Sequence, residues 1–283
     1  WANVYRAEYT YYVTGEGADS GGNFHGLSGD LKTVATRYWD GGQWAGGDTY
    51  YYRYYTEPTF DGQQNFIGFA HGRRREVLPN AYNKLSAYAA GLGKTPDELL
   101  DSEMAAYTCF YYEYDAFRRV TSETVFGGLR TTTFAYTERS NAVLNGDGTI
   151  NADVWTRKTV ENRPDGSTYT VYTNYLGQTL LSDLADPSEN HTYTYYEYDL
   201  DGRPILTAGT SAIDAYDDGA NDDFRISLTV TGAGPVDQYT YYATTTATAE
   251  TAGGAAGYLA TRSIAEGLIA PTGGATSYWN TEM

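Results

Sequence analysis

The feature that most constrains the fold is a short pattern that occurs twice in the sequence. Residues 111–120 read YYEYDAFRRV and residues 195–205 read YYEYDLDGRPI, so Tyr114 of the first copy aligns with Tyr198 of the second. Tyrosine favours β-strands, whereas Asp and Gly favour tight turns. Each copy therefore predicts a strand, a turn and a second strand. Because this unit recurs, we expect antiparallel hairpins stacked into an extended, curved sheet.

In the second copy, each position of the turn has an interpretable role. Asp199 can accept a hydrogen bond from the amide two residues further on, and Gly202 can adopt a positive φ at the end of the turn. Arg203 then lies where it can pair with Asp199 or with Glu197. A one-residue slip would destroy this pairing, so we expect it to fix the register of the hairpin.

The tyrosines of the strand before this turn alternate between its two faces. A period of two puts Tyr196 and Tyr198 on one face, and Tyr193 and Tyr195 on the other. We expect the rings to pack against cross-strand neighbours and the hydroxyl groups to remain for hydrogen bonds or water.

The first copy is degenerate at one position. It keeps Tyr114, Asp115 and Arg119 at the same spacing, but Arg118 stands where the second copy has Gly202. Other Tyr- and Thr-rich segments are weaker relatives of the same unit, and they occupy residues 5–17, 48–69, 167–183 and 237–250.

Composition agrees with a mainly β fold and restricts the partners. The 283 residues include 30 Tyr and 32 Gly, which suits many short strands and turns. The formal net charge of −17 argues against a nucleic-acid partner, because phosphate binding needs a basic surface. No apolar run approaches the roughly 20 residues of a membrane span, so membrane insertion is not expected.

Two short helices are expected near 79–106, inside the β pattern. Residues 79–91 have apolar residues at helical spacing, and residues 96–106 follow a start signal in which Thr95 caps the helix and Glu98 completes a capping box. We expect these helices to cover one sheet face or an open edge. The predicted regions are a β-hairpin region 1–78, the helical insertion 79–106, repeat hairpins 107–210 and a further β and loop region 211–283.

The Tyr-Asp-x-x-Gly-Arg pattern after a Tyr-rich strand resembles the YD repeat of the RHS/YD-repeat family. This family includes bacterial surface and toxin-carrier proteins and the teneurins. The resemblance rests on Tyr198, Asp199, Gly202 and Arg203 and is clearest over about 105–210. It implies a continuous spiral of antiparallel hairpins, often wrapped into a hollow shell. The C-terminal core region, self-cleavage site and variable toxin tip of that family have no match in this sequence.

Residues that often carry chemistry have ordinary structural interpretations here. The three histidines, His25, His71 and His191, lie far apart in loop-like contexts, and no Gly-x-Ser-x-Gly motif is present. Cys109 is the only cysteine, so an intrachain disulfide and a cysteine metal site are excluded. We expect Cys109 to be a small buried residue on a strand. No catalytic residue and no cofactor are predicted.

Two acidic segments are candidate cation sites. Residues 145–153 superficially resemble a calcium loop, but Val143 and Val154 stand where that loop needs carboxylates, so a hairpin turn is expected. Residues 212–225 contain several aspartates and are expected to form a solvated surface loop. No metal site is predicted.

Glycans are candidate ligands or modifications. Trp39 and Trp44 flank a Gly-rich loop at 39–48, and with Trp155 they are candidates for stacking on sugars, although ordinary packing is the favoured interpretation. Asn190 begins the triplet Asn-His-Thr, which is a candidate N-glycosylation acceptor. Paired carboxylates for glycoside hydrolysis cannot be identified from sequence, because their separation is set by the fold.

The sequence therefore predicts a non-catalytic structural protein of an extracellular or cell-surface assembly. Hairpin arrays leave two open sheet edges, so the expected partners are other copies of the chain, joined head to tail into a fibre, or the rest of a longer parent chain. The absence of an initiator Met supports the expectation of a longer or processed parent. The alternatives are a fragment of an RHS-type toxin-carrier shell and a carbohydrate-binding adhesin module.

Overall fold

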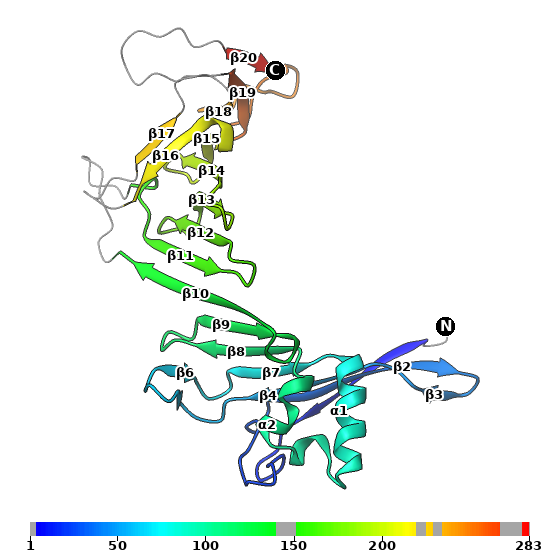
Figure 1. The fold of residues 1–283 in the computed structure, drawn as a ribbon. Coiled ribbons are helices and arrows are strands. Elements are labelled where there is room, and N and C mark those ends of the chain that lie inside the picture. The colour runs from blue at the N-terminus through cyan, green and yellow to red at the C-terminus, as the bar shows by residue number, and fades with distance from the viewer. Residues whose placement is uncertain (1–3, 140–150, 219–224, 229–233, 267–278, 283) are drawn as a thin grey trace. The chain divides into compact units, whose positions relative to one another are not determined.

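A computed structural model of the chain describes residues 4–139, 151–218, 225–228, 234–266 and 279–282 (Figure 1). The chain divides into two compact units, unit 1 (Trp1–Phe134) and unit 2 (Ala135–Met283). Both units consist mainly of antiparallel strands, and two short helices lie between residues 79 and 106. The predicted fold class, mainly β with antiparallel hairpins and two inserted helices, is therefore confirmed.

The sheet of unit 1 has the strand order β1-β2-β4-β7-β8-β9-β10, and β3 pairs with β2. A second, two-stranded sheet of β5 and β6 is inserted between β4 and β7. The strands are β1 (Tyr5–Tyr11), β2 (Leu31–Asp40), β3 (Gln43–Ala45), β4 (Thr49–Tyr54), β5 (Thr59–Phe60), β6 (Phe66–Gly68), β7 (Arg73–Val77), β8 (Phe110–Tyr114), β9 (Val120–Val125) and β10 (Arg130–Glu138).

The β5–β6 insertion is closed at its base by two backbone hydrogen bonds. The Tyr55 N–H donates to the Gly72 carbonyl at 2.8 Å, and the His71 N–H donates to the Tyr55 carbonyl at 2.9 Å. These bonds hold the two ends of the insertion together, so β4 and β7 pair directly although 18 residues separate them.

The first predicted helix is confirmed, because α1 spans Pro79–Gly91. The second predicted helix, 96–106, is instead broken into a 3₁₀ turn (Pro96–Glu98), the short helix α2 (Asp101–Met104) and another 3₁₀ turn (Ala105–Tyr107). The expected cap is present, since the Glu98 carboxylate accepts the Thr95 N–H at 2.7 Å.

The break in this helix has a physical cause. The carbonyls of Pro96 and Leu99, which a continuing helix would bond internally, each accept a hydrogen bond from Arg53 Nη2 at 2.8 Å. Arg53 is fully buried, and its guanidinium takes the place of the missing helical turn.

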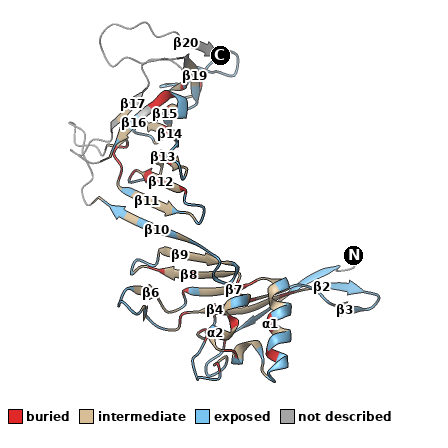
Figure 2. Ribbon diagram, viewed as in Figure 1, coloured by how far each residue is buried: buried red, intermediate tan, exposed pale blue. Residues whose placement is uncertain are grey.

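The helical segment covers one face of the unit 1 sheet, as predicted. Leu85 and Ala89 of α1 pack into a buried cluster with residues of β4, β7 and the segment after α1, while most other side chains of α1 are partly or fully exposed (Figure 2). The buried members of this cluster are Tyr51, Val77, Leu85, Ala89, Leu99 and Met104.

The sheet of unit 2 has the strand order β11-β12-β13-β14-β15-β18-β19-β20, and β16 and β17 form a separate hairpin. The strands are β11 (Arg157–Asn162), β12 (Thr168–Thr173), β13 (Thr179–Ala185), β14 (His191–Tyr198), β15 (Pro204–Gly209), β16 (Ile213–Asp217), β17 (Arg225–Leu228), β18 (Pro235–Tyr241), β19 (Leu259–Glu266) and β20 (Trp279–Glu282).

Two predictions for the C-terminal part of the chain were wrong. Residues 212–225 were expected to be a loop, but β16 and β17 pair there, because Tyr216 packs edge-on against Tyr172 at 5.6 Å between ring centroids. The strand expected over 237–250 ends at Tyr241. Beyond it, the Thr-rich segment forms a loop that is closed where the Tyr242 N–H donates to the Tyr258 carbonyl at 2.9 Å.

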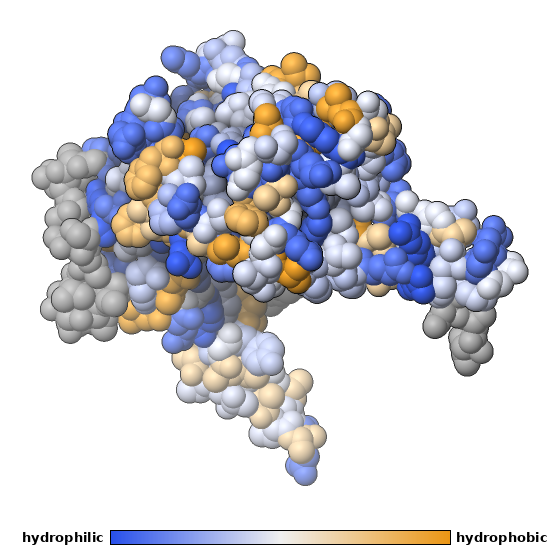
Figure 3. Space-filling view, turned by 90° about the horizontal axis from the view of Figure 1, so that it is seen from below, coloured by the Kyte–Doolittle hydropathy of each residue, from blue (hydrophilic) through white to orange (hydrophobic). Residues whose placement is uncertain are grey.

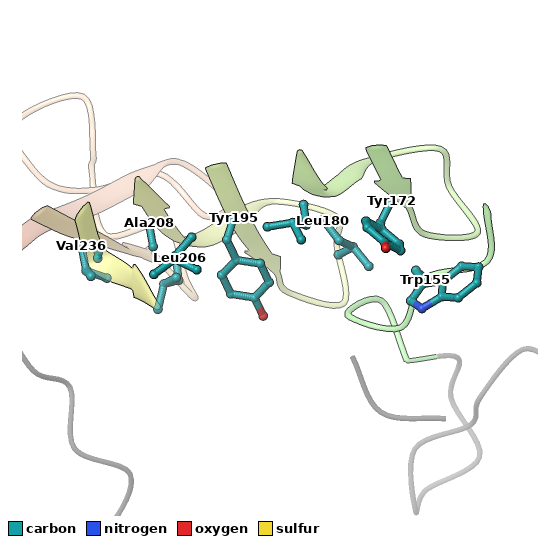
Figure 4. Close-up of a cluster of buried hydrophobic side chains, with 10 residues drawn as sticks. Trp155, Tyr172, Leu180, Tyr195, Leu206, Ala208 and Val236 are labelled. Carbon is teal, nitrogen blue, oxygen red and sulfur yellow. The ribbon is translucent and has the colours of Figure 1, made fainter. Parts of the chain in front are cut away.

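The core of unit 2 is an apolar row that crosses the sheet. Tyr172, Leu181, Tyr195, Ala208 and Val236 lie directly opposite one another on β12, β13, β14, β15 and β18, and all are buried. Residues that face each other across strands share one face of a sheet, so this row defines the buried face. Figure 4 shows much of this row with the neighbouring side chains of Trp155, Leu180 and Leu206.

The division of the chain into two units falls between Phe134 and Ala135, which is inside β10 and inside the predicted region 107–210. On the face seen in Figure 3, hydrophobic side chains form small patches that hydrophilic side chains separate. Among the described residues, no helix has the length and apolar character that crossing a membrane requires.

Candidate functional site: a repeated turn with a tyrosine pin

The turn after Tyr198 is organised by one carboxylate. Asp199 Oδ1 accepts the backbone N–H groups of Asp201 at 3.0 Å and Arg203 at 2.9 Å, and Oδ2 accepts Arg203 Nε at 2.7 Å. Gly202 has φ +76° and donates its N–H to the Asp199 carbonyl at 2.9 Å. Of the two predicted partners of Arg203, the structure therefore selects Asp199, while Glu197 accepts a hydrogen bond from the Tyr195 hydroxyl.

The first copy makes the same turn in unit 1. Asp115 Oδ1 accepts the N–H groups of Phe117 and Arg119, both at 2.9 Å, and Oδ2 accepts Arg119 Nε at 2.7 Å. Arg118 replaces glycine and still adopts the left-handed conformation, with φ +65°. An arginine in that conformation is strained, so the carboxylate and the fifth residue determine the turn more strongly than the glycine does.

Electrostatics favours the ionised form of both carboxylates. Partial burial opposes ionisation of Asp199, but the hydrogen bonds and positive charge of Arg203 outweigh it, so the pKa of Asp199 is lowered. The same balance with Arg119 lowers the pKa of Asp115. The ion pair within each turn is therefore formed at neutral pH.

Four further turns have this geometry, and two of them lie in 48–69 and 167–183, which the sequence predicted as weaker relatives of the unit. In each, the first residue is Asp or Asn, the fourth has a positive φ, and the side chains of the first and fifth residues are hydrogen-bonded. In three of these turns the side-chain amide of the fifth residue donates to the first, as the arginine does at 119 and 203, whereas at 174–178 Asn174 Nδ2 donates to Gln178 Oε1. We call all six segments the repeat turns, and they are residues 19–23, 61–65, 115–119, 174–178, 186–190 and 199–203.

The tyrosine before the turn has a defined role as well. The hydroxyl of Tyr198 donates to the carbonyl of Thr179, the first residue of β13, at 2.9 Å. The Tyr114 hydroxyl donates in the same way to Arg73 at the start of β7 at 2.7 Å. A third such bond joins Tyr241 to Pro204 at the start of β15 at 2.7 Å. We call Tyr114, Tyr198 and Tyr241 the tyrosine pins, because each fixes the beginning of a neighbouring strand.

A one-residue bulge accompanies the turn-proximal end of many hairpins. In the pair β8–β9, Tyr114 lies opposite Val120 and Glu113 lies opposite Ser122, so Thr121 has no cross-strand partner. Such bulges increase the local twist of a strand pair. Residues at equivalent positions in other strand pairs are Lys32, Ile67, Arg74, Leu180, Ile205 and Ala260.

The predicted faces of β14 are confirmed, and the candidate glycosylation site has an unexpected location. The rings of Tyr196 and Tyr198 stack on one face, 6.3 Å between centroids. Asn190 is exposed and is the fifth residue of the repeat turn 186–190, where its Nδ2 donates to Asp186 Oδ2 at 2.8 Å. The nitrogen that would carry a glycan therefore already closes a turn.

The histidines all lie beside aspartates. His71 Nδ1 is 2.8 Å from Asp30 Oδ1, and His191 Nδ1 is 2.8 Å from Asp183 Oδ1. His25 is buried and lines a cavity in unit 1. Cys109 does not fit its predicted place, because it is only partly buried and lies in the bend before β8, where the backbone turns from the preceding 3₁₀ segment into the strand.

The tryptophans fit sugar stacking poorly. Trp39 and Trp44 pair edge to face across β2 and β3, with centroids 5.2 Å apart. The expected long loop between them is only the turn Gly41-Gly42. Trp155 is buried, and Arg139 lies over its ring.

Both candidate cation sites lie partly outside the described residues. The parts outside are residues 145–150 of the first site, and Asp222 and Asp223 of the second. Asp218 is described and holds Lys158 Nζ at 2.7 Å. Within the residues that the structure describes, no group of three or more metal-ligating side chains is assembled.

Compared with known proteins, the chain matches no family model and no curated protein.

Proposed function

We propose that this chain is a non-catalytic structural protein of the YD-repeat type, which acts as a building block of an extracellular or cell-surface assembly. The observation that carries the proposal is the recurrence of one self-contained device, the repeat turn with its tyrosine pin, in both units. In each device the carboxylate bonds within its own turn, and the tyrosine hydroxyl bonds to the start of the adjacent strand. Such units suit a protein whose product is an extended sheet surface.

The edge strand β1 offers a way to continue the sheet. Among the described residues, β1 pairs only with β2, and Ala7 lies opposite Thr36. The Thr36 N–H donates to the Asp48 carbonyl at 2.8 Å, away from β1. In an antiparallel pair, two directly opposite residues either both direct their N–H and C=O groups toward each other or both direct them away from each other. Because the Thr36 N–H points away from β1, the N–H and C=O of Ala7 point away from β2, toward the open edge.

The side chains on this edge do not block it. Tyr5 and Tyr9 are exposed, and they alternate with Arg6 and Glu8, which pair with each other. At the other end of the strand order, β20 pairs only with β19 among the described residues. We propose that β1 of one copy pairs with β20 of the next, which gives a head-to-tail polymer.

Electron microscopy and light scattering of the purified chain test this function with a matched pair of variants. Ala7→Pro removes the outward N–H and is tolerated at an edge, whereas Ala7→Thr keeps that donor. We expect fibres from the wild type and Ala7→Thr, and monodisperse particles from Ala7→Pro.

Three outcomes would contradict the proposal. A wild-type chain that stays monomeric at high concentration removes the self-assembling function. Fibres that persist in Ala7→Pro place the joint elsewhere. Closed hollow particles in place of fibres would favour the shell of a toxin carrier.

A further inference from the structure

A cavity of about 450 Å³ in unit 1 has no role in the hairpin architecture. It is bounded by the repeat turn 19–23 and the residues after it, the end of β4, the bulge residue Arg74 and the beginning of α2. Its volume lies within the roughly 300–1,000 Å³ of typical ligand pockets. The cavity lies within unit 1, so both of its walls belong to one compact body.

Most charges in the cavity wall are already compensated. The carboxylate of Asp101 pairs with Arg53 at 2.9 Å and also with Arg74 and Arg75. The carboxylate of Asp19 accepts backbone and side-chain hydrogen bonds within its own turn. A strongly charged ligand would have to displace these pairs, so the wall favours an uncharged one.

Two nitrogen atoms in this wall lack a hydrogen-bond partner. His25 is only 3% exposed, and its Nε2 lies 3.6 Å from Asp19 Oδ2, too far for a hydrogen bond. The buried Nε of Arg74 is also without a partner. Buried polar atoms of native proteins are nearly always satisfied, so each exception calls for an explanation.

His25 is suited to meet a neutral oxygen group. Burial, followed by the positive charge of Arg53, lowers the pKa of His25 to about 4, so its ring is neutral at physiological pH. A neutral imidazole offers one N–H donor and one acceptor. A hydroxyl group can donate and accept, and it therefore complements both His25 and the Arg74 N–H.

Aromatic rings complete the lining. Phe24 lies in the wall with 47% of its surface exposed, and Tyr54 and the buried Tyr55 lie beside it. Rings of this kind offer apolar faces next to polar groups.

We propose that this cavity binds an uncharged sugar of one or two rings, whose C–H face packs on the aromatic side chains and whose hydroxyls reach His25 and Arg74. The site is independent of the proposed assembly function.

Ligand-observed NMR can test the site with glucose, galactose, mannose and N-acetylglucosamine at millimolar concentration. We expect at least one of them to bind, and protein-observed spectra of the histidine rings recorded in parallel should show a shift of the His25 signals. Phe24→Ala should weaken binding about tenfold, because it removes an exposed ring without disturbing the core. His25→Gln should weaken it by a similar factor. Trp39→Ala, which changes an aromatic ring outside the cavity, serves as the matched control and should leave binding unchanged.

The proposal fails if none of the four sugars binds. It also fails if binding is equal in the wild type and Phe24→Ala, or if Trp39→Ala abolishes it. Displacement of the sugar by acetate or inorganic phosphate would reassign the cavity as an anion site. If His25→Gln does not fold, the exposed Phe24→Ala variant alone decides the question. None of these results depends on whether the chain forms fibres.

Discussion

The repeat turns at 115–119 in unit 1 and 199–203 in unit 2 make the same hydrogen bonds, but the sheets behind them are stabilised differently. In unit 1, the face of the sheet is covered by the helical segment, and a buried arginine bonds to the part of it from Pro96 to Asp101. In unit 2, the buried face is an apolar row from Tyr172 to Val236. The turn is therefore a local device that works with either kind of core.

The difference shows where each unit concentrates its stability. Arg53 is 0% exposed and donates to Tyr51, Asp101 and three backbone carbonyls, so a single side chain connects β4 to the helical segment. The apolar row of unit 2 spreads its contribution over strands from β12 to β18. A single substitution should therefore affect unit 1 more than unit 2.

Arg53→Met should have the largest effect, a loss of about 3–5 kcal/mol in the free energy of unfolding of unit 1. Methionine fills much of the volume but leaves Asp101 and the carbonyls of Pro96 and Leu99 without this donor. Urea denaturation combined with hydrogen exchange would measure the loss and locate it in β4 and the helical segment. Arg203→Met, at a partly exposed turn position of unit 2, is the control and should cost far less. Equal losses would mean that the two units are not stabilised differently.

Asp115→Ala and Asp199→Ala should have smaller and matching effects, about 1–2 kcal/mol each. Each variant removes the acceptor of two backbone N–H groups and an arginine. The exchange rates of the amides at 117 and 119, and at 201 and 203, would report the opening of each turn. The Asp→Asn variants keep one acceptor oxygen and should lose less. A loss in only one unit would show that the turn depends on the core behind it.

Gly202→Ala should cost about 1 kcal/mol, because alanine is strained at φ +76°. The reciprocal change Arg118→Gly relieves strain at φ +65°, although the added freedom of the unfolded chain offsets part of the gain. Thermal melts of both variants would measure how the residue at the fourth position of each turn changes the melting temperature. If Arg118→Gly is clearly destabilising, the arginine side chain makes a contact that outweighs its backbone strain.

The smallest expected effect is a pH dependence specific to unit 2. Burial, followed by the negative charge of Asp153, raises the pKa of Glu197, and burial raises the pKa of Asp153 as well. A carboxyl group with a raised folded pKa contributes stability below its unfolded pKa and loses it as the pH rises through the folded value. The lowered pKa values of Asp115 and Asp199 have the opposite sign, because their contribution is lost as the pH falls through their folded values.

Glu197→Gln should therefore raise the urea midpoint of unit 2 at neutral pH and leave it nearly unchanged at a pH well below about 4.3, the ordinary pKa of glutamate. Midpoints measured across this range, with the wild type as reference, would isolate this group. Parallel pH profiles for the two proteins would show that Glu197 does not titrate with a raised pKa.

Local patterns in the sequence predicted much of the fold. The Ala- and Leu-rich spacing located α1 to the residue, and Asp199, Gly202 and Arg203 predicted their own turn, because each of these interactions lies within a few residues. A turn was predicted within 48–69, but its position at 61–65 was not, because Gln64 adopts a positive φ without being glycine and Asn65 replaces the arginine. Asp or Asn followed four residues later by Arg, Asn or Gln is the signal that would have found it.

Interactions between distant residues explain the errors. The helix expected over 96–106 is interrupted by Arg53, which lies more than 40 residues earlier in the chain. The strand β16 forms in an Asp-rich segment because Tyr216 packs on Tyr172. The cavity at His25 is lined by four separated segments of the chain, and no local sequence pattern predicts that they come together.

The inserted hairpin of β5 and β6 has a practical consequence. Its base is closed by the backbone of Tyr55 and Gly72, so the spacing of β4 and β7 does not depend on how many residues lie between them. The tip at 61–65 is accordingly a natural place to display a foreign peptide or a fluorescent tag. In a polymer of this chain, every repeat would then carry one copy of the cargo at a regular interval.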